Sequence, residues 1–196
     1  MACGALARPQ ANCEAEGRTI IFSDESGFYL LPAVVSTYAP VGQTPCLRSV
    51  LTRDHLSVIS GITPEGRLFV YIRESAFDSA GVIGFLEHLL RSIPGKLLVI
   101  WDGATIHRSR EIKAFLSGLS ERGPEYEGRL QLERLPGYAP ELNPDEGIWR
   151  HLKRVEMKNL CCRNLEHLKE ELRKAVRRLR HKPHIVQSCF AHAGCV

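Results

Sequence analysis

Acidic side chains occur at three places in the sequence where a strand or a helix is predicted to begin or end. Asp24 and Asp102 each follow an apolar run, and Asp145 and Glu146 follow an Asn-Pro pair that is typical of a helix start. Carboxylate oxygens are the ligands that hard divalent cations prefer. Cleavage of a phosphodiester needs an activated water and a neutralised leaving oxygen, which two Mg²⁺ ions roughly 3.5 to 4 Å apart supply together. If folding brings these acids together, they indicate metal-dependent phosphodiester chemistry.

Each acid also has an ordinary structural interpretation. Asp102 precedes a glycine, and Asp-Gly after a strand is a common turn. Asp24 lies in the string Ser-Asp-Glu-Ser-Gly, which favours a turn in the same way. Glu146 lies three residues after Asn143, which is the spacing of a capping box. A helical wheel does not decide whether Asp145 or Glu146 could face a metal, because Asp145 points closer to the apolar stripe of the helix and Glu146 lies at the edge of that stripe.

Two further residues are weaker candidates. His107 follows Asp102 by five residues, where it could contact phosphate or a leaving group, or could be an ordinary polar residue at the start of a helix. Trp149 fits a helix core better than a platform for base stacking. The cysteines and the other histidines lack the spacing of zinc ligands. The sequence also lacks P-loop, dinucleotide-binding and serine-esterase motifs, so it does not support those chemistries.

Apolar periodicity predicts the first elements that must position these acids. A β-branched and aromatic run predicts a strand that ends at Asp24, and a further extended stretch is expected around residues 30–36. The segments 55–62 and 67–73 flank Thr-Pro-Glu-Gly and predict an antiparallel hairpin. The amino-terminal half therefore begins with antiparallel strands.

The pattern then alternates between helix and strand. A helix is predicted to start at Asp78 or Ser79, and residues 97–101 are apolar without alternation, which is typical of a central parallel strand. A second amphipathic helix and the alternating strand LQLERLP follow. Parallel neighbours lie about 4.8 Å apart. If the strands ending at Asp24 and Asp102 are neighbours, their carboxylates can share one cation.

The carboxyl-terminal third is predicted to be helical and basic. Asn143 can cap a helix with Pro144 at its first position, and the last clear helix runs from about Leu165 to Leu179. Residues 150–182 contain twelve Lys or Arg and four Glu, which suggests that a polyanion lies across one end of the molecule. A solvated helix face accounts for this charge about equally well. The first of these helices is expected to bury Ile148, Trp149, Leu152 and Val155.

The composition excludes several classes of protein. The chain has 196 residues, 44% hydrophobic and 24% charged, with a formal net charge of +4, so it is neither collagen-like nor disordered and needs no disulfides to fold. We expect a poorly ordered tail over residues 1–17 and one domain over 18–196. The seven cysteines include no C-x-x-C pair, and the sequence has no secretory signal. It also has no apolar stretch near the ~18 residues of a membrane span. We therefore expect a cytoplasmic protein without membrane contact.

Three strings in the sequence occur together in one protein family. FSDESGFYLLP, VIWDGATIH and LPGYAPELNPDEGIWRHLK resemble, in this order, the catalytic blocks of the DDE transposases of the mariner-related bacterial insertion-sequence branch. The resemblance spans about residues 18 to 190, and the third block is its most diagnostic part. It implies an α/β, ribonuclease H-like fold. The expected sheet is mixed and five-stranded, with three antiparallel strands followed by parallel strands, and helices flank it.

The resemblance also implies roles for individual residues. Asp24, Asp102 and Glu146 correspond to the catalytic, metal-binding acids, which decides against Asp145 at the third position. The supporting members of the blocks are His107, Asn143 and Trp149. The implied cofactor is a pair of Mg²⁺ ions, with Mn²⁺ as an alternative. The implied reaction is hydrolysis at the ends of a mobile element, followed by attack of the freed 3′-hydroxyl on target DNA.

The expected partners are transposon-end and target DNA, with the chain acting as a homodimer on DNA near the bacterial nucleoid. Such transposases usually carry helix-turn-helix domains before the catalytic core, and about twenty residues precede Asp24, so we expect a separate helix-turn-helix polypeptide. Two alternatives are an inactive DNA-binding remnant and another ribonuclease H-like nuclease, acting on RNA:DNA hybrids or junctions. The residues expected to hold DNA phosphates are Lys153, Arg154, Arg173, Lys174, Arg177 and Arg178.

Overall fold

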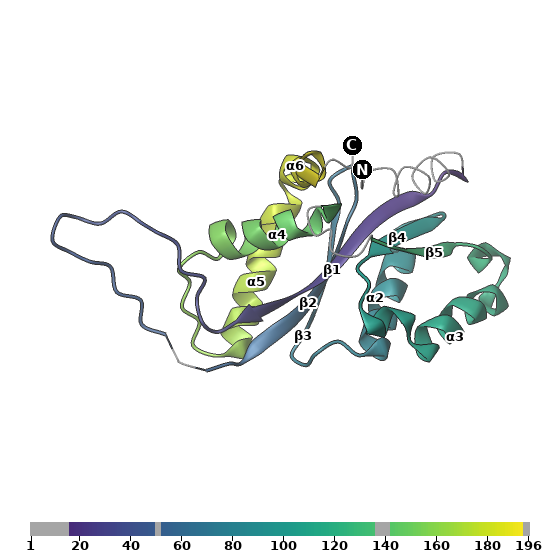
Figure 1. The fold of residues 1–196 in the computed structure, drawn as a ribbon, viewed down its shortest axis with the longest axis horizontal. Helices are drawn as coiled ribbons and strands as arrows, with labels where there is room; N and C mark the ends of the chain where they lie inside the picture. Colours follow the sequence, from purple (N-terminus) through teal and green to yellow (C-terminus); the bar gives the residue numbers. More distant parts are fainter. Residues whose placement is uncertain (1–15, 50–51, 136–141, 194–196) are drawn as a thin grey trace.

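Five strands form one mixed sheet in the computed structural model, which describes residues 16–49, 52–135 and 142–193 (Figure 1). The spatial order is β3-β2-β1-β4-β5. The first three strands pair antiparallel, whereas the β1–β4 and β4–β5 pairs are parallel, as expected. Most of the predicted tail lies outside the described residues. The strands are β1 (Thr19–Tyr29), β2 (His55–Ile62), β3 (Leu68–Arg73), β4 (Leu97–Trp101) and β5 (Leu130–Arg134).

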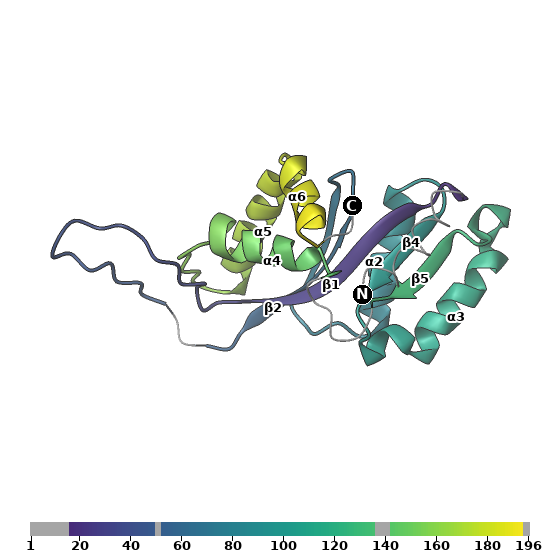
Figure 2. The ribbon, with the colours of Figure 1, turned by 45° about the horizontal axis from the view of Figure 1, so that its top comes forward.

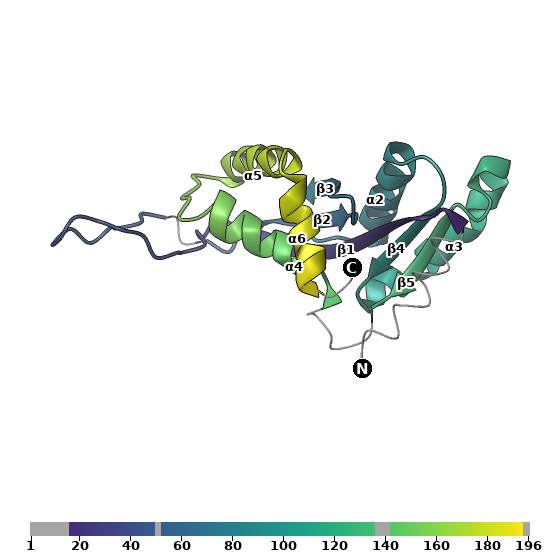
Figure 3. The same ribbon diagram turned by 90° about the horizontal axis from the view of Figure 1, so that it is seen from above.

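Helices cover both faces of the sheet (Figures 2 and 3). One face carries α2 (Ser79–Ser92) and α3 (Arg110–Leu119). The other carries α4 (Asp145–His151), α5 (Leu165–Arg180) and α6 (Pro183–Ala193). In the part of the chain that is described, no helix is both long and apolar enough to cross a membrane. The short helical turns are η1 (Thr105–Arg108), η2 (Ser120–Arg122), η3 (Pro124–Tyr126) and η5 (Leu152–Glu156), of which η5 is a π-helix.

Strand β4 lies between two hydrophobic cores. All five of its residues are buried, as its unbroken apolar run predicted. Leu98 and Ile100 pack in the core beneath α4, α5 and α6, whereas Val99 and Trp101 pack in the core beneath α2 and α3. The end of β4 is therefore fixed from both sides, which holds the following Asp102 in place.

Strand β1 does not end at Asp24, in contrast to the prediction. Its parallel pairing with β4 stops at the Ser23–Trp101 pair, but its antiparallel pairing with β2 continues to Tyr29. The β2 ladder thus overrides the turn preference of Ser-Asp-Glu-Ser-Gly. Asp24 consequently lies in the middle of a strand, immediately beyond the point where its neighbour β4 ends.

The stretch around residues 30–36 joins no strand of the sheet. Asn159 holds it instead: its side-chain Oδ1 accepts a hydrogen bond from the N–H of Val35 (2.8 Å), and its Nδ2 donates to the Val35 carbonyl (2.9 Å). Beyond this anchor the connection from β1 to β2 extends away from the sheet (Figure 1) and exposes Tyr38 and Val41.

Two features of the carboxyl-terminal third differ from the predictions. Val155 is exposed rather than buried, because the chain after α4 widens into the π-helix η5, where the N–H of Met157 donates to the carbonyl of Leu152. Helix α6 was not predicted, although Pro183 at its first position gives a start signal. Its buried residues, Val186, Cys189, Phe190 and Ala193, have helical spacing.

Candidate active site

Asp24 is the innermost of the three predicted metal-binding acids. It is largely buried, and its Oδ2 accepts a hydrogen bond from the indole Nε1 of Trp149 over 2.9 Å. Burial raises its pKa from the ordinary 3.8 to about 6, against hydrogen bonds from Trp149 and from the Glu25 backbone. The nearby charges of Glu146 and Asp102 raise this pKa further. The three acids therefore share one electrostatic environment, although they are far apart in the sequence.

Asp102 combines the two interpretations that its sequence allowed. Its Oδ1 accepts a hydrogen bond from the N–H of Ala104 over 3.1 Å, which is the turn expected of Asp-Gly. The same oxygen lies 3.0 Å from Nδ1 of His107, and the Asp102 side chain is about half exposed. The turn therefore presents the carboxylate to solvent at the end of β4.

The structure separates the two adjacent acids at the start of α4. Asp145 is fully buried, and the hydroxyl of Ser60 donates to its Oδ1 over 2.6 Å. Burial raises the pKa of Asp145 well above its ordinary value, which favours the neutral carboxyl. Glu146 is exposed, and its charge acts on Asp24. Of these two acids, only Glu146 is exposed to solvent.

Trp149 links α4 to the sheet, and Asn143 lies just before the helix. Oδ1 of Asn143 accepts a hydrogen bond from the N–H of Asp145 over 3.2 Å. The N-cap of α4 is Pro144 rather than the predicted Asn143, so the helix begins one residue later than predicted. Trp149 is buried, and its ring packs edge-on against Phe28 while its Nε1 reaches Asp24. Trp149 therefore belongs to the core and also contacts the acid cluster, which is our name for Asp24, Asp102 and Glu146.

His107 lies between two carboxylates, those of Asp102 and Glu25. Its Nδ1 lies 3.0 Å from Oδ1 of Asp102, and its Nε2 lies 3.3 Å from Oε1 of Glu25. The ring stacks on Trp101 with centroids 4.1 Å apart. Sequence reasoning missed Glu25 because it ended β1 at Asp24. A strand that continues would have placed Glu25 on the face opposite to Asp24.

The predicted DNA-binding residues fall into two groups. Nζ of Lys153 donates to the hydroxyl of Ser26 over 2.7 Å, beside the acids on β1. Burial lowers the pKa of Lys153, which the charges of Glu146 and Asp24 partly offset. Arg154 follows Lys153 on η5, whereas the other four predicted residues lie on α5. Of these four, Lys174 pairs with Glu171 and Arg178 with Glu156, and Arg173 and Arg177 line a hollow against β3.

A protein family model matches most of the chain. The family described as DDE superfamily endonuclease matches residues 19–169, which include every acid of the cluster. The chain belongs to the DDE superfamily of endonucleases. Among curated proteins, none matches this DDE chain.

Solved structures similar to this DDE chain include several of Mos1, a mariner transposase. The Mos1 catalytic domain is 16% identical with a TM-score of 0.53, over 98% of this chain and 90% of that one. The Mos1 strand transfer complex is 18% identical with a TM-score of 0.60, and the Mos1 paired-end complex with Mg is 19% identical with a TM-score of 0.62. These two matches cover 98% of this chain but 59% and 60% of the Mos1 chains. The likeness establishes the ribonuclease H-like fold of transposase catalytic domains.

The three acids of this DDE chain have the chemistry of a divalent-cation site. They offer only carboxylate oxygens, which suit Mg²⁺ and Mn²⁺. Burial is the main cause of the raised pKa of Asp24, and the negative charges of Glu146 and Asp102 add to it. Within the described residues, however, no three His, Cys, Asp or Glu side chains lie close enough to form a metal site. The acids are thus within electrostatic reach of one another rather than in coordination contact.

Proposed function

We propose that this chain is the catalytic domain of a DNA transposase, which cleaves phosphodiester bonds at the ends of a mobile element and joins the freed 3′-hydroxyl to target DNA. The observation that carries the proposal is the shared environment of Asp24, Asp102 and Glu146 in a DDE endonuclease fold. The similar Mos1 structures include complexes with a transposon end, with Mn and with Mg, which supports DNA as substrate and a divalent cation as cofactor.

Asp24, Asp102 and Glu146 would hold two Mg²⁺ ions, or Mn²⁺ in their place. Such a metal pair supplies activation of the attacking oxygen and neutralisation of charge on the leaving oxygen. The protein residues around the acids orient them: Trp149 fixes the Asp24 carboxylate, and His107 contacts that of Asp102. These contacts limit the rotamers of two acids before any substrate arrives.

Both proposed steps are in-line displacements at phosphorus. In the first, a water oxygen forms a bond to phosphorus as the bond to the 3′-oxygen breaks, and that oxygen leaves as the 3′-hydroxyl. In the second, this hydroxyl attacks a phosphodiester of the target and displaces its 3′-oxygen. Lys153 lies beside the acids, where its positive charge would favour the approach of a phosphate.

The adjacent acids on α4 give a matched test of the proposal. Supercoiled plasmid DNA is incubated with the wild type, with Glu146→Gln and with Asp145→Asn, in Mg²⁺, Mn²⁺ or EDTA. We expect metal-dependent nicking by the wild type, a loss of about a hundredfold or more in Glu146→Gln, and retention in Asp145→Asn, because Asp145 is buried and its raised pKa favours the neutral carboxyl. Nicking in EDTA, or equal loss in both variants, would contradict this assignment.

The same assay separates the alternative functions. DNA binding without cleavage under any metal would identify a non-catalytic DNA-binding protein. Preferential cleavage of RNA:DNA hybrids or junctions over transposon-end duplexes would identify another ribonuclease H-like nuclease. The proposed homodimer on DNA and the separate helix-turn-helix polypeptide rest on the family resemblance, and size measurements on DNA complexes would test the dimer.

A further inference from the structure

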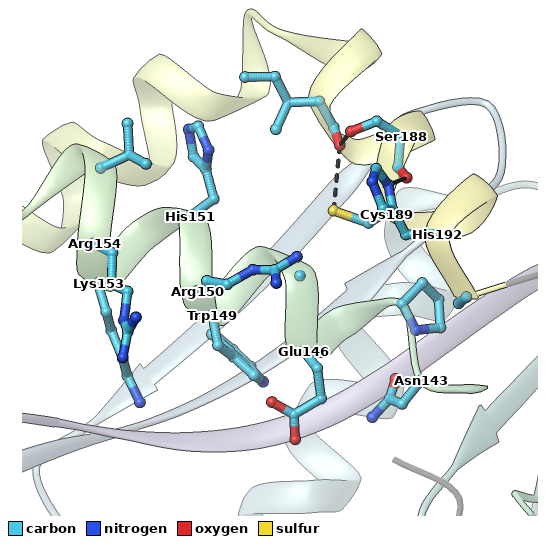
Figure 4. A pocket seen from close by; sticks show the side chains of 15 residues that line it. Asn143, Glu146, Trp149, Arg150, His151, Lys153, Arg154, Ser188, Cys189 and His192 are labelled. Carbon is cyan, nitrogen blue, oxygen red and sulfur yellow. Dashed lines mark hydrogen bonds between the residues drawn. The ribbon is translucent and has the colours of Figure 1, made fainter. Parts of the chain in front are cut away.

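An open groove begins at the third acid and runs between α4 and α6. Its volume is about 980 Å³, and Glu146 lies at one end of it (Figure 4), whereas Asp145 does not line it. Gly147 allows the two helices to approach closely, because a Cβ at this position would lie 2.7 Å from Sγ of Cys189. The charged and polar side chains that line the groove are Asn143, Glu146, Arg150, His151, Lys153, Arg154, Ser188 and His192.

The charge of this groove is positive. Three cationic side chains, Arg150, Lys153 and Arg154, line it against a single carboxylate, that of Glu146. In Figure 4, Arg150 extends from α4 toward α6. Its charge acts on Cys189 of α6, whose thiol pKa it lowers against the larger effect of burial.

The two arginines of the groove have no protein partner among the described residues. Both side chains are exposed, and neither Arg150 nor Arg154 forms a hydrogen bond or an ion pair through its guanidinium there. Glu146 precedes Arg150 by four residues, a spacing that permits an ion pair, yet no ion pair joins them among the described residues. Like charges one helical turn apart repel each other weakly at an exposed site, and a bound anion would relieve that repulsion.

Glu156, the carboxylate of η5, already pairs with other cations. It lies 2.6 Å from Arg178 and 2.9 Å from Lys182. Burial raises the pKa of Glu156, but the hydrogen bonds from these two cations outweigh burial and lower it to about 2. Glu156 is therefore engaged by Arg178 and Lys182, whereas Arg150 and Arg154 form no ion pair among the described residues.

We propose that the groove between α4 and α6 binds the phosphate backbone of the DNA strand that leads to the acids, with Arg150 and Arg154 as its phosphate contacts. Guanidinium groups bind phosphate oxygens through paired N–H donors, and such contacts position a strand without reading its sequence. This inference rests on the proposed function, because it names the surface that guides DNA to the acids. It assigns Arg150, which the sequence reasoning did not select, a role equal to that of Arg154.

The test measures DNA binding in EDTA, where cleavage cannot interfere. Affinity for a linear duplex is measured by filter binding at several salt concentrations for the wild type and for the double variant Arg150→Gln/Arg154→Gln. The matched control, Arg110→Gln/Lys113→Gln, removes the same charge from the exposed start of α3 on the opposite face of the sheet. Circular dichroism establishes that each variant is folded.

We expect the groove variant to bind at least tenfold more weakly and the slope of log K against log salt to fall by about two, one for each lost phosphate contact. The control should keep the wild-type slope. An unchanged slope in the groove variant, an equal loss in the control, or a wild type that does not bind DNA would overturn the proposal. If the salt slope falls in the groove variant but the wild type never nicks DNA, the groove remains a DNA-binding surface and the proposed catalytic function is wrong.

Discussion

The indole of Trp149 donates a hydrogen bond to the carboxylate of Asp24 over 2.9 Å, across 125 positions of sequence. Asp24 lies in the middle of β1, and Trp149 follows Glu146 by one helical turn on α4. Together with the Ser60–Asp145 hydrogen bond, this contact positions the helix that carries the third acid relative to the strand that carries the first. The acid cluster depends on this contact as much as on the acids themselves.

Removal of this hydrogen bond should weaken metal binding more than it weakens the fold. Trp149→Phe keeps an aromatic ring but removes the side-chain donor of Asp24 and leaves only the hydrogen bond from the Glu25 backbone, so its carboxylate is less firmly oriented. We expect the Mg²⁺ concentration for half-maximal nicking to rise about tenfold or more. The free energy of unfolding should fall by roughly 1.5 to 3 kcal/mol. Phe190→Leu is the control, since this buried ring packs on Phe22 and should lower stability without changing the Mg²⁺ requirement.

The raised pKa of Asp24 predicts a pH dependence of stability. The folded pKa is about 6 and the ordinary value is 3.8, so the native state binds more protons between these values. The stabilisation is fully present below about pH 3.8 and is lost as the pH rises through 6. In EDTA at pH 7.5, Asp24→Asn should thus be more stable than the wild type, by up to about 3 kcal/mol. Urea unfolding at pH 4 should show no such gain, and a gain of equal size at both pH values would contradict the assignment.

The contacts of His107 predict a graded effect on the second acid. His107 touches Asp102 directly, whereas Glu25 reaches Asp102 only through the imidazole ring. We expect His107→Ala to raise the Mg²⁺ concentration for half-maximal nicking by about 10- to 100-fold, and Glu25→Gln to raise it less. Glu65→Gln, which changes an exposed carboxylate in the β2–β3 turn, should leave it unchanged. A larger effect from Glu25→Gln than from His107→Ala would show that Glu25 does not act through the ring.

The close approach of α6 to α4 should depend on Gly147. Gly147→Ala would place a methyl group 2.7 Å from Sγ of Cys189, and we expect it to lower the free energy of unfolding by roughly 1 to 3 kcal/mol. Cys189→Ala removes that sulfur and should restore part of the loss in the double variant. Chemical denaturation of the two single variants and the double variant measures this coupling, and strict additivity of the two losses would rule out the contact.

Much of the fold followed from patterns that need no tertiary information. The unbroken apolar run 97–101 predicted the central strand β4, and Asp78 caps α2 by accepting a hydrogen bond from the N–H of Gly81, as its position suggested. The end of β1 could not be predicted in the same way. Pairing with β2 outweighs the local turn preference around Asp24, and only the register of the two strands reveals this.

The candidate site shows the same division. The types and positions of Asp24, Asp102 and Glu146 were visible in the sequence, but the burial that distinguishes Asp145 from Glu146 depends on Ser60 of β2, which is 85 residues away. The pairing of basic residues was equally invisible, because it depends on where Glu156 lies relative to α5. The count of charged residues therefore identified the basic region, but it did not show which basic side chains form ion pairs within the protein.

The two tryptophans of the chain lie on opposite sides of the acid cluster, one stacked on His107 and the other bonded to Asp24. Indole fluorescence responds to nearby charge and to hydrogen bonding, so the protein carries an intrinsic optical probe of its own site. Single-tryptophan variants would separate the signals from the two faces of the sheet. Ion or DNA binding could then be followed in real time, without a dye and without waiting for a strand to break.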